Sequence, residues 1–329
     1  MADKPKVLIA RSVFPEVIER LQAVFELRTN QDDAVWTQAE LIGHLQGRDG
    51  VFLVGGHRID QALLAACPQL KIVANMAVGY NNLDIAAMTA AGVLATNTPD
   101  VLTESTADFG FALLMACARR ICEGEHYLRA GQWSKWHYDQ LLGAEIHGST
   151  LGILGMGRIG QAIAKRGAFG FGMKVFYHNR SRLDASLESA CQANYVSKAE
   201  LLQRADHLLL VVPYSPESHH SIGAAELAQM RPTATLVNIA RGGIVDDVAL
   251  AAALQKGTIA AAGLDVFEGE PVVHPALLAL KNVVLTPHIA SATRATRLAM
   301  ANLAADNLVA FFTGKVPPSL INPARAAIK

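Results

Sequence analysis

Three ionisable residues, each following a predicted strand, define the chemistry open to this sequence. Arg241 precedes two glycines, and a guanidinium there can bind a carboxylate through paired hydrogen bonds. His288 follows a proline, and a protonated imidazole can neutralise the charge that develops on a carbonyl oxygen during ketone reduction. A neighbouring carboxylate would favour the protonated ring and orient it, and the candidates are Asp265, Glu268 and Glu270. The set indicates reduction of the ketone of a small acid.

A glycine-rich turn earlier in the chain predicts a dinucleotide site. The turn Gly155-Met156-Gly157-Arg158-Ile159-Gly160 follows the apolar run 151–154 and precedes apolar residues at helical spacing from 163 to 168. A strand, a glycine turn and a helix in this order place a pyrophosphate on the N-terminus of the helix. A plain tight turn between strand and helix is the alternative.

The segment Asn179-Arg180-Ser181-Arg182, which follows the next predicted strand, bears on the choice of cofactor. A site selective for NAD normally has Asp or Glu about 20 residues after the glycines, where it bonds the ribose 2′-hydroxyl. Here an amide, a hydroxyl and two guanidinium groups take that place, and arginine can bind a 2′-phosphate. The sequence therefore favours NADP(H), with NAD(H) also accepted, and a solvated basic turn is the alternative.

Composition argues against several other classes of partner. The 329 residues include 29 Lys+Arg and 29 Asp+Glu, so the formal net charge is zero and the basic surface of a nucleic-acid binder is not expected. No apolar stretch reaches transmembrane length, and the first residues do not resemble a signal peptide. The four cysteines lack the spacing of metal ligands, so no metal site is expected. We expect a cytoplasmic protein that acts on a small-molecule 2-oxo or 2-hydroxy acid and binds neither nucleic acid nor a membrane.

Strand-like and helix-like segments alternate along the chain, which predicts parallel sheets covered by helices. In the first part we expect strands at Lys6–Ala10, Gly50–Val54 and Leu70–Met76, and helices at Glu16–Phe25, Asp60–Ala66 and Asn82–Ala91. One long helix is expected from Ser105 to Gly131. In the second part we expect further strands at Lys174–His178, His207–Val212, Thr235–Ile239, Ala261–Val266 and Asn282–Thr286. A last helix, Ala290–Thr313, is expected to pack back onto the first part.

The predicted fold class is therefore α/β, with two doubly wound parallel-sheet domains. Because the glycine turn begins well inside the chain, the nucleotide domain is expected as an insert at residues 101–290. Residues 1–100 and 291–329 would together form a discontinuous substrate domain. The expected architecture is a Rossmann nucleotide domain inserted in a flavodoxin-like substrate domain.

The motifs taken together resemble the D-isomer-specific 2-hydroxyacid dehydrogenases, and within them the glyoxylate/hydroxypyruvate reductase branch. The resemblance covers essentially the whole chain. It rests on the glycine turn, Ala77–Asn82, Thr98–Val101, Ala240–Gly243, Gly263–Phe267, Glu270-Pro271 and Pro287–Ile289. Asn81-Asn82 and the arginine-containing turn at 179–182 point to the branch.

The resemblance implies a homodimer, with each active site in a cleft between the two domains. It implies that Arg241 binds the substrate carboxylate, that His288 donates the proton and that Glu270 supports His288. Val78 and Gly79 would offer backbone amides to the same carboxylate. The other residues expected at the cofactor, besides 155–160 and 179–182, are Thr106, Val212, Pro213, Ile239, Ala240, Asp265, His288 and Ala290.

Two alternatives stay open at this point. One keeps the chemistry and changes the substrate and cofactor, as in an NAD-dependent D-2-hydroxyacid, phosphoglycerate or sugar-acid dehydrogenase. The other is a non-catalytic protein that senses dinucleotides on the same fold, because such a protein can retain Arg, Glu and His at these places.

Overall fold

The computed structural model describes residues 3–322, so the outermost ends of the expected substrate domain lie outside the described residues. The chain divides into two compact units. Unit 1 comprises Met1–Leu102 and Thr293–Lys329, and unit 2 comprises Thr103–Ala292. Both divisions of the chain fall two residues beyond the boundaries expected from the sequence, at 102 and 292 rather than 100 and 290.

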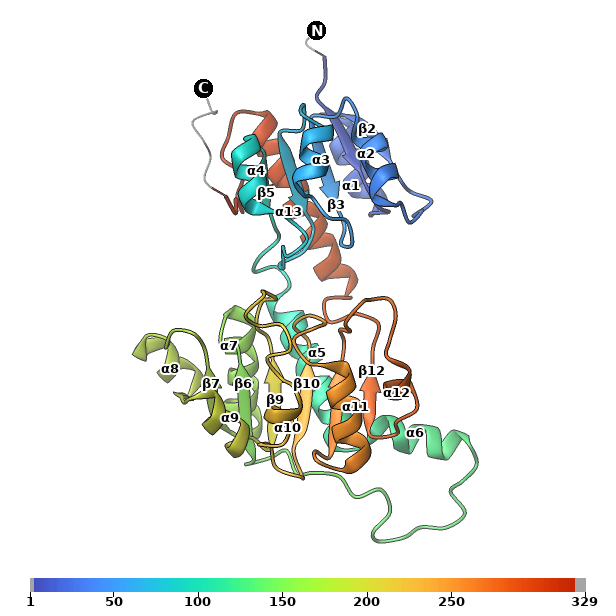
Figure 1. The fold of residues 1–329 in the computed structure, drawn as a ribbon, viewed down its shortest axis with the longest axis vertical. Helices are drawn as coiled ribbons and strands as arrows, with labels where there is room; N and C mark the ends of the chain where they lie inside the picture. The colour runs from blue at the N-terminus through green and yellow to red at the C-terminus, as the bar shows by residue number, and fades with distance from the viewer. Residues whose placement is uncertain (1–2, 323–329) are drawn as a thin grey trace. The chain divides into compact units, whose positions relative to one another are not determined.

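Unit 1 is built on a parallel sheet of five strands in the order β2-β1-β3-β4-β5 (Figure 1). This is the strand order of flavodoxin-like folds. Its strands are β1 (Lys6–Ile9), β2 (Glu26–Thr29), β3 (Gly50–Leu53), β4 (Ile72–Asn75) and β5 (Leu94–Thr96). Its helices are α1 (Pro15–Gln22), α2 (Gln38–Leu45), α3 (Gln61–Ala66), α4 (Ile85–Ala91) and α13 (Arg294–Phe312).

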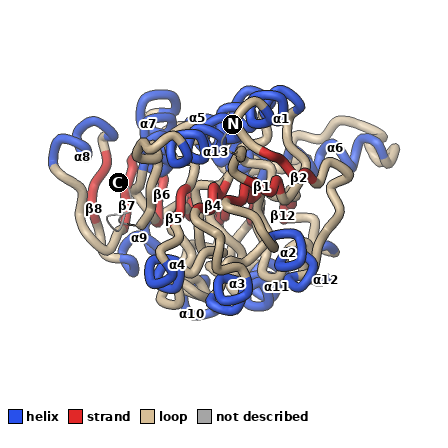
Figure 2. Tube along the Cα trace, turned by 90° about the horizontal axis from the view of Figure 1, so that it is seen from above, coloured by secondary structure: helices blue, strands red, loops and turns tan. Residues whose placement is uncertain are grey.

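Helices cover both faces of this sheet (Figure 2). Helices α1 and α13 lie on one face, and α2, α3 and α4 lie on the other. The strands are buried on both sides, which explains why β3 and β4 read as continuous apolar runs rather than alternating patterns. Thr293 is the N-cap of helix α13, and its side chain accepts a hydrogen bond from the Thr296 amide. The helix completes unit 1, as the sequence predicts.

Unit 2 contains a parallel sheet of seven strands in the order β12-β11-β10-β9-β6-β7-β8. Its strands are β6 (Thr150–Leu154), β7 (Lys174–His178), β8 (Ala193–Tyr195), β9 (His207–Leu210), β10 (Thr235–Asn238), β11 (Ala261–Leu264) and β12 (Val283–Leu285). Its helices are α5 (Thr103–Ala118), α6 (Ile121–Arg129), α7 (Arg158–Lys165), the π-helix η1 (Arg166–Gly170), α8 (Ala185–Cys191), α9 (Lys198–Arg204), α10 (Ala224–Leu227), α11 (Asp247–Lys256) and α12 (Pro275–Leu278).

The strand order of unit 2 is the doubly wound order of a dinucleotide-binding fold with one strand added at β12. Successive side chains of the central strands enter different cores. Ile153 packs with α5 and α7, whereas Leu154 packs with α9 and α11. The chain runs outward in one direction from β6 to β8 and in the other from β9 to β12, so the order reverses between β6 and β9. Ligands of open α/β sheets bind at the carboxyl ends of the strands beside such a reversal.

The prediction of one long helix from Ser105 to Gly131 is wrong. Two helices, α5 and α6, are separated at Arg120, whose φ of +52° is left-handed and ends the first helix. The Arg120 side chain stabilises this break, because it donates hydrogen bonds to Glu123 and to the carbonyl oxygen of Leu142. None of the helices within residues 3–322 is both long and apolar enough to span a membrane.

Candidate active site

The predicted catalytic residues of unit 2 lie at the carboxyl ends of three neighbouring strands. Arg241 follows β10, Glu270 lies on the turn after β11, and His288 follows β12. The three strands pair in parallel, so their carboxyl ends meet at one edge of the sheet. His288 Nδ1 lies 2.8 Å from Glu270 Oε2, which confirms the geometric expectation of a histidine beside a carboxylate. Of the candidates, Glu270 is the carboxylate that contacts the ring.

Both carboxylate oxygens of Glu270 have hydrogen-bond partners. Oε1 accepts a hydrogen bond from the Phe267 amide at 2.9 Å, and Oε2 faces His288. Burial raises the pKa of Glu270, but the hydrogen bonds from His288 and Phe267 and the charges of His288 and Arg241 outweigh it. The net effect is a pKa below the usual value, so Glu270 is ionised at neutral pH. The ring therefore has a fixed negative partner on its Nδ1 side.

The segment that carries His288 is fastened to Asp265, a fully buried residue at the end of β11. Asp265 Oδ1 accepts hydrogen bonds from the Thr286 hydroxyl and the Ile289 amide, and Oδ2 accepts one from the Ala290 amide. His288 has a φ of +54°, a left-handed conformation that costs energy outside glycine and persists only where neighbours enforce it. Asp265 thus positions His288, a role that the sequence did not suggest. Contacts of Asp265 and Ala290 with the cofactor stay predictions.

The glycine after Arg241 allows its loop to lie against the turn that carries Glu270. A Cβ atom at Gly242 would lie 1.7 Å from the carbonyl oxygen of Phe267, so only glycine lets this loop approach the turn that holds Glu270. Burial lowers the pKa of Arg241, and the charge of Glu270 opposes that effect. Nη1 of Arg241 donates a hydrogen bond to the Ala240 carbonyl oxygen at 2.6 Å. The arrangement combines a partly buried guanidinium with a histidine–carboxylate pair.

Val78 and Gly79, the predicted amide donors, belong to unit 1 and follow β4. Two asparagine side chains fix their peptide groups. Asn97 donates to the carbonyl oxygen of Val78 at 2.9 Å, and Asn75 donates to that of Gly79 at 3.1 Å. These contacts set the direction of the loop's peptides, and substrate binding by them stays a prediction.

The glycine turn has the shape that a pyrophosphate requires. Gly155 has a φ of +101°, and an added Cβ would lie 2.7 Å from the backbone of Val211 at the end of β9. At Gly160 an added Cβ would lie 2.2 Å from the carbonyl oxygen of Gly155, so this glycine allows α7 to begin against the strand. Gly157, the N-cap of α7, has nothing within 4 Å of such an atom. The first and third glycines are needed for packing, whereas the second leaves open space at the helix N-terminus.

Other predicted cofactor residues follow the neighbouring strands β9 and β10 or lie on α5. Val212 and Pro213 follow β9, Ile239 and Ala240 follow β10, and Thr106 lies on α5. Gly110, one turn along α5 from Thr106, packs against Ile239, since an added Cβ would lie 2.7 Å from its Cδ1. Within the described residues, the buried Thr106 hydroxyl has no hydrogen-bond partner. A buried hydroxyl without a partner is costly, and a polar group of a bound dinucleotide would satisfy it. The residues present fit such a cofactor.

The two arginines of the 179–182 turn have different surroundings. Arg182 forms two hydrogen bonds with Glu188, from Nε at 2.9 Å and from Nη2 at 2.8 Å. Glu188 also accepts a hydrogen bond from the buried Tyr177 hydroxyl, and burial followed by this contact raises the Tyr177 pKa to about 12. Arg180 is exposed. Arg182 therefore has a partner within the protein and shapes the turn, a role that sequence reasoning missed.

Asn179 and Ser181 complete the turn. Asn179 Oδ1 accepts a hydrogen bond from the Met156 amide at 2.6 Å, which ties the turn to the glycine loop. Ser181 is exposed beside Arg180. The pKa of Glu217 is lowered mainly by a hydrogen bond from Ser215. The positive charge of Arg180 lowers it further, to a smaller degree. Glu188, which lies in the helix that follows the turn, has no feature in the sequence that marks it as the partner of Arg182.

Comparison with known proteins identifies the family. Residues 111–290 match a family model described as D-isomer specific 2-hydroxyacid dehydrogenase, NAD binding domain. The chain is also 48% identical over 323 residues to the glyoxylate reductase of Thermococcus onnurineus, covering 97% of this chain and 96% of that relative. This protein is a D-isomer-specific 2-hydroxyacid dehydrogenase.

Further relatives place this dehydrogenase in the glyoxylate reductase branch. It is 47% identical over 331 residues to the glyoxylate reductase of Aeropyrum pernix, covering 97% of this chain and 96% of that relative. Among solved structures it resembles the NADPH-dependent glyoxylate/hydroxypyruvate reductase of Sinorhizobium meliloti in complex with NADP and malonate, with a TM-score of 0.85. That alignment has 37% identity and covers 97% of both chains. The dehydrogenase is an oxidoreductase whose unit 2 binds a nicotinamide dinucleotide.

Proposed function

We propose that this dehydrogenase reduces a small 2-oxo acid of the glyoxylate and hydroxypyruvate type to the D-2-hydroxy acid. The observation that carries the proposal is the 2.8 Å contact between His288 Nδ1 and Glu270 Oε2, with the charge of Arg241 beside it. A cation that binds a carboxylate and a histidine that donates a proton are the two groups that a 2-oxo acid needs. The names of the relatives in Thermococcus onnurineus and Aeropyrum pernix support the same substrate class.

Each residue has a separate task in this proposal. Arg241 binds the substrate carboxylate, aided by the backbone amides of Val78 and Gly79. When bound, the nicotinamide cofactor supplies the hydride that the carbonyl carbon accepts. Because Nδ1 of His288 is engaged with Glu270, Nε2 is the atom that gives its proton to the carbonyl oxygen. Glu270 keeps the ring oriented and offsets its positive charge.

We propose NADPH as the preferred cofactor, with Arg180 as the residue that binds the 2′-phosphate. No carboxylate stands at positions 179–182 to repel that phosphate. Since Arg182 is engaged with Glu188, the proposal assigns the phosphate contact to Arg180 and assigns Arg182 the support of the turn. The related enzyme from Sinorhizobium meliloti is named as NADPH-dependent, which is consistent with this assignment.

The experiment compares two arginine variants under the same conditions. The kcat/KM for NADPH and for NADH is measured with glyoxylate and with hydroxypyruvate in the wild type, Arg180→Ala and Arg182→Ala. Loss of a charge-assisted contact at an exposed site costs about 1.5 kcal/mol, so Arg180→Ala should lose about tenfold in efficiency with NADPH. Efficiency with NADH should stay nearly unchanged. Arg182→Ala is the matched control, and it should lower stability more than it changes the ratio between the two cofactors.

Two results would overturn parts of the proposal. Turnover of neither glyoxylate nor hydroxypyruvate by the wild type would contradict the substrate class. Equal wild-type efficiency with NADPH and NADH would contradict the assignment of NADPH, while leaving the reaction itself intact.

We also propose that the protein is a homodimer in which a second copy covers α6 and the segment that follows it. In Figure 1 this part of unit 2 extends away from its sheet. Its exposed large apolar side chains are Ile121, Leu128, Trp133, Trp136, Tyr138 and Leu142. Light scattering should show a dimer for the wild type and for the control Val35→Glu, and a monomer for Leu128→Glu. A monomeric wild type would contradict the proposal.

A cytoplasmic location remains part of the proposal. All four cysteines lie within the described residues and are free thiols, and Cys67, Cys117 and Cys191 are buried. Free thiols are typical of reducing compartments. Fractionation of cells that express the protein at its native level tests the location.

A further inference from the structure

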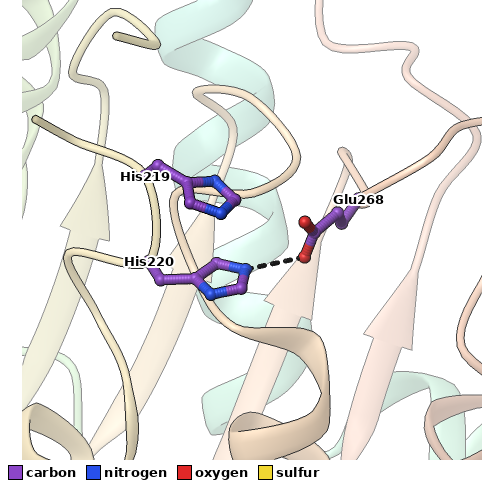
Figure 3. Close-up of side chains that lie close together, drawn as sticks. All are labelled: His219, His220 and Glu268. Carbon is purple, nitrogen blue, oxygen red and sulfur yellow. Dashed lines mark hydrogen bonds and ion pairs between the residues drawn. The ribbon is translucent and has the colours of Figure 1, made fainter. Parts of the chain in front are cut away.

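A cluster of metal-binding side chains lies outside the catalytic residues. His219 and His220 stand between β9 and α10, and Glu268 stands on the turn after β11 (Figure 3). Each of the three offers one ligand atom, and these atoms lie within 4.8 Å of one another. His219 and Glu268 are exposed, and His220 is partly exposed. The sequence gives no sign of this site, because Glu268 is separated from His220 by 48 residues.

The two nitrogens of each histidine ring have different surroundings. Nδ1 of His219 lies 3.1 Å from the Tyr214 hydroxyl, and Nδ1 of His220 lies 4.0 Å from Asp246 Oδ2. Nε2 of His220 lies 2.8 Å from Glu268 Oε2. Metal-binding histidines usually bond a hydroxyl, carbonyl or carboxylate through the nitrogen that does not bind the ion. The Tyr214 hydroxyl is such a partner for Nδ1 of His219, whereas Asp246, 4.0 Å from Nδ1 of His220, lies beyond hydrogen-bond distance. In His220 it is Nε2 that faces Glu268, so we assign Nε2 of each ring to the ion.

We propose that His219, His220 and Glu268 bind a divalent transition-metal ion of the zinc class. Two imidazole nitrogens and one carboxylate oxygen suit such an ion, whereas calcium and magnesium prefer oxygen ligands alone. Three protein ligands leave the fourth position of a tetrahedral site for water, as in zinc sites that keep an open position. The proposal is independent of the reductase function, because none of the three ligands is Arg241, Glu270 or His288.

Binding requires a small rearrangement of exposed side chains. Bond lengths of about 2.1 Å in a tetrahedral site put neighbouring ligand atoms about 3.4 Å apart, closer than the 4.8 Å limit seen here. The rings of His219 and His220 are stacked, with centroids 3.9 Å apart and planes 21° apart, so one ring must turn to aim its nitrogen at a shared ion. The ion would also replace the hydrogen bond between His220 and Glu268. Each of these changes is a rotation about side-chain bonds.

The backbone beneath the cluster is already fixed. The His220 amide donates a hydrogen bond to the Gly243 carbonyl oxygen at 2.7 Å, and the Glu268 amide donates one to Asp247 at 3.2 Å. An ion would therefore join the segment after β9 to the turn that also carries Glu270, two residues beyond Glu268. It would strengthen a connection that the fold already makes.

The test measures Zn²⁺ binding to the full chain after removal of metal with a chelator. Calorimetric titration should show one Zn²⁺ ion per chain in the wild type. His219→Ala and Glu268→Gln should each bind about tenfold more weakly or worse, since even loss of an outer partner costs about 10–100-fold in affinity. Tyr214→Phe removes only the hydroxyl beside His219 and should also weaken binding. Circular dichroism of each variant establishes that it is folded.

Two controls separate this site from other histidines. His137→Ala removes an exposed histidine elsewhere in unit 2, and His288→Ala removes the histidine of the active-site pair. Both should bind Zn²⁺ as the wild type does. Absence of Zn²⁺ binding in the wild type would overturn the proposal. So would loss of binding in His288→Ala with binding retained in His219→Ala, because the ion would then occupy the catalytic pair.

Discussion

Replacement of Glu270 by glutamine removes the charge beside His288 and keeps the shape of the side chain. The amide oxygen of glutamine can still accept the hydrogen bond from the Phe267 amide. Its NH₂ group then faces Nδ1 of His288, which must accept a hydrogen bond there, so the ring is held in a neutral form. A neutral ring keeps a hydrogen on Nε2 but is a much weaker acid. The reductive reaction should slow for that reason.

The magnitude follows from the exposure of the pair. A hydrogen bond to a charged group contributes about 1.5–3 kcal/mol. The side chains of His288 and Glu270 are 45% and 33% exposed, so water screens their interaction and the lower part of that range applies. A loss of about 1.5–2 kcal/mol in the transition state corresponds to about 10–30-fold in kcat/KM.

The assay is the steady-state reduction of glyoxylate and hydroxypyruvate over a range of pH, with NADPH binding measured separately. Glu200→Gln, on α9, is the matched control and should behave as the wild type does. Cofactor binding should be the same in all three proteins, since Glu270 is not among the predicted cofactor residues. A Glu270→Gln enzyme within twofold of the wild type at every pH would refute the idea that this carboxylate supports the proton donor.

Three further predictions test neighbouring parts of the structure. Arg241→Lys keeps the charge but loses the planar pair of donors, so kcat/KM for the 2-oxo acid should fall sharply while NADPH titration by fluorescence is unchanged. Gly157→Ala should keep the thermal stability of the wild type and weaken NADPH binding, whereas Gly160→Ala should destabilise the fold by about 1–3 kcal/mol, because only the latter Cβ meets the backbone. The reverse order of effects would contradict the assignment of the glycines. Hydrogen bonds from Arg182 and then Tyr177 lower the pKa of Glu188 from 4.5 to about 2, so the stability it contributes is complete above pH 4.5 and is lost as the pH falls toward 2. Urea unfolding should therefore show Glu188→Gln less stable than the wild type at pH 7, with a difference that shrinks between pH 4.5 and 2.

Most strands of the fold could be predicted because buried parallel strands appear in the sequence as continuous apolar runs. β7 was predicted at its observed bounds, and the predicted strands at 207–212, 235–239 and 261–266 each begin where β9, β10 and β11 begin. The break between α5 and α6 was not predicted, because left-handed backbone is uncommon at arginine. The side chain of Arg120 bonds Glu123 and also the carbonyl oxygen of Leu142, 22 residues away, and the second contact exists only in the folded chain.

The residue types at the strand ends could be read from the sequence. Which side chain contacts which could not, because the partners lie far apart along the chain. Glu270 was one of several candidates for His288, and only the folded chain shows which carboxylate meets the ring. Arg182 looked like a phosphate ligand in the sequence, yet Glu188 in the following helix engages it. Asp265 looked like a cofactor contact, and it also fastens the segment that carries His288.

The most direct test of the central claim is the rate at which His288→Ala oxidises NADPH in the presence of glyoxylate. Loss of a positioned general acid costs about 10²–10⁴-fold, so the variant should be slower than the wild type by at least about 100-fold. It should bind NADPH with unchanged affinity, because the glycine turn and Arg180 are intact. A His288→Ala enzyme that turned over glyoxylate within tenfold of the wild type would contradict the claim that this histidine donates the proton.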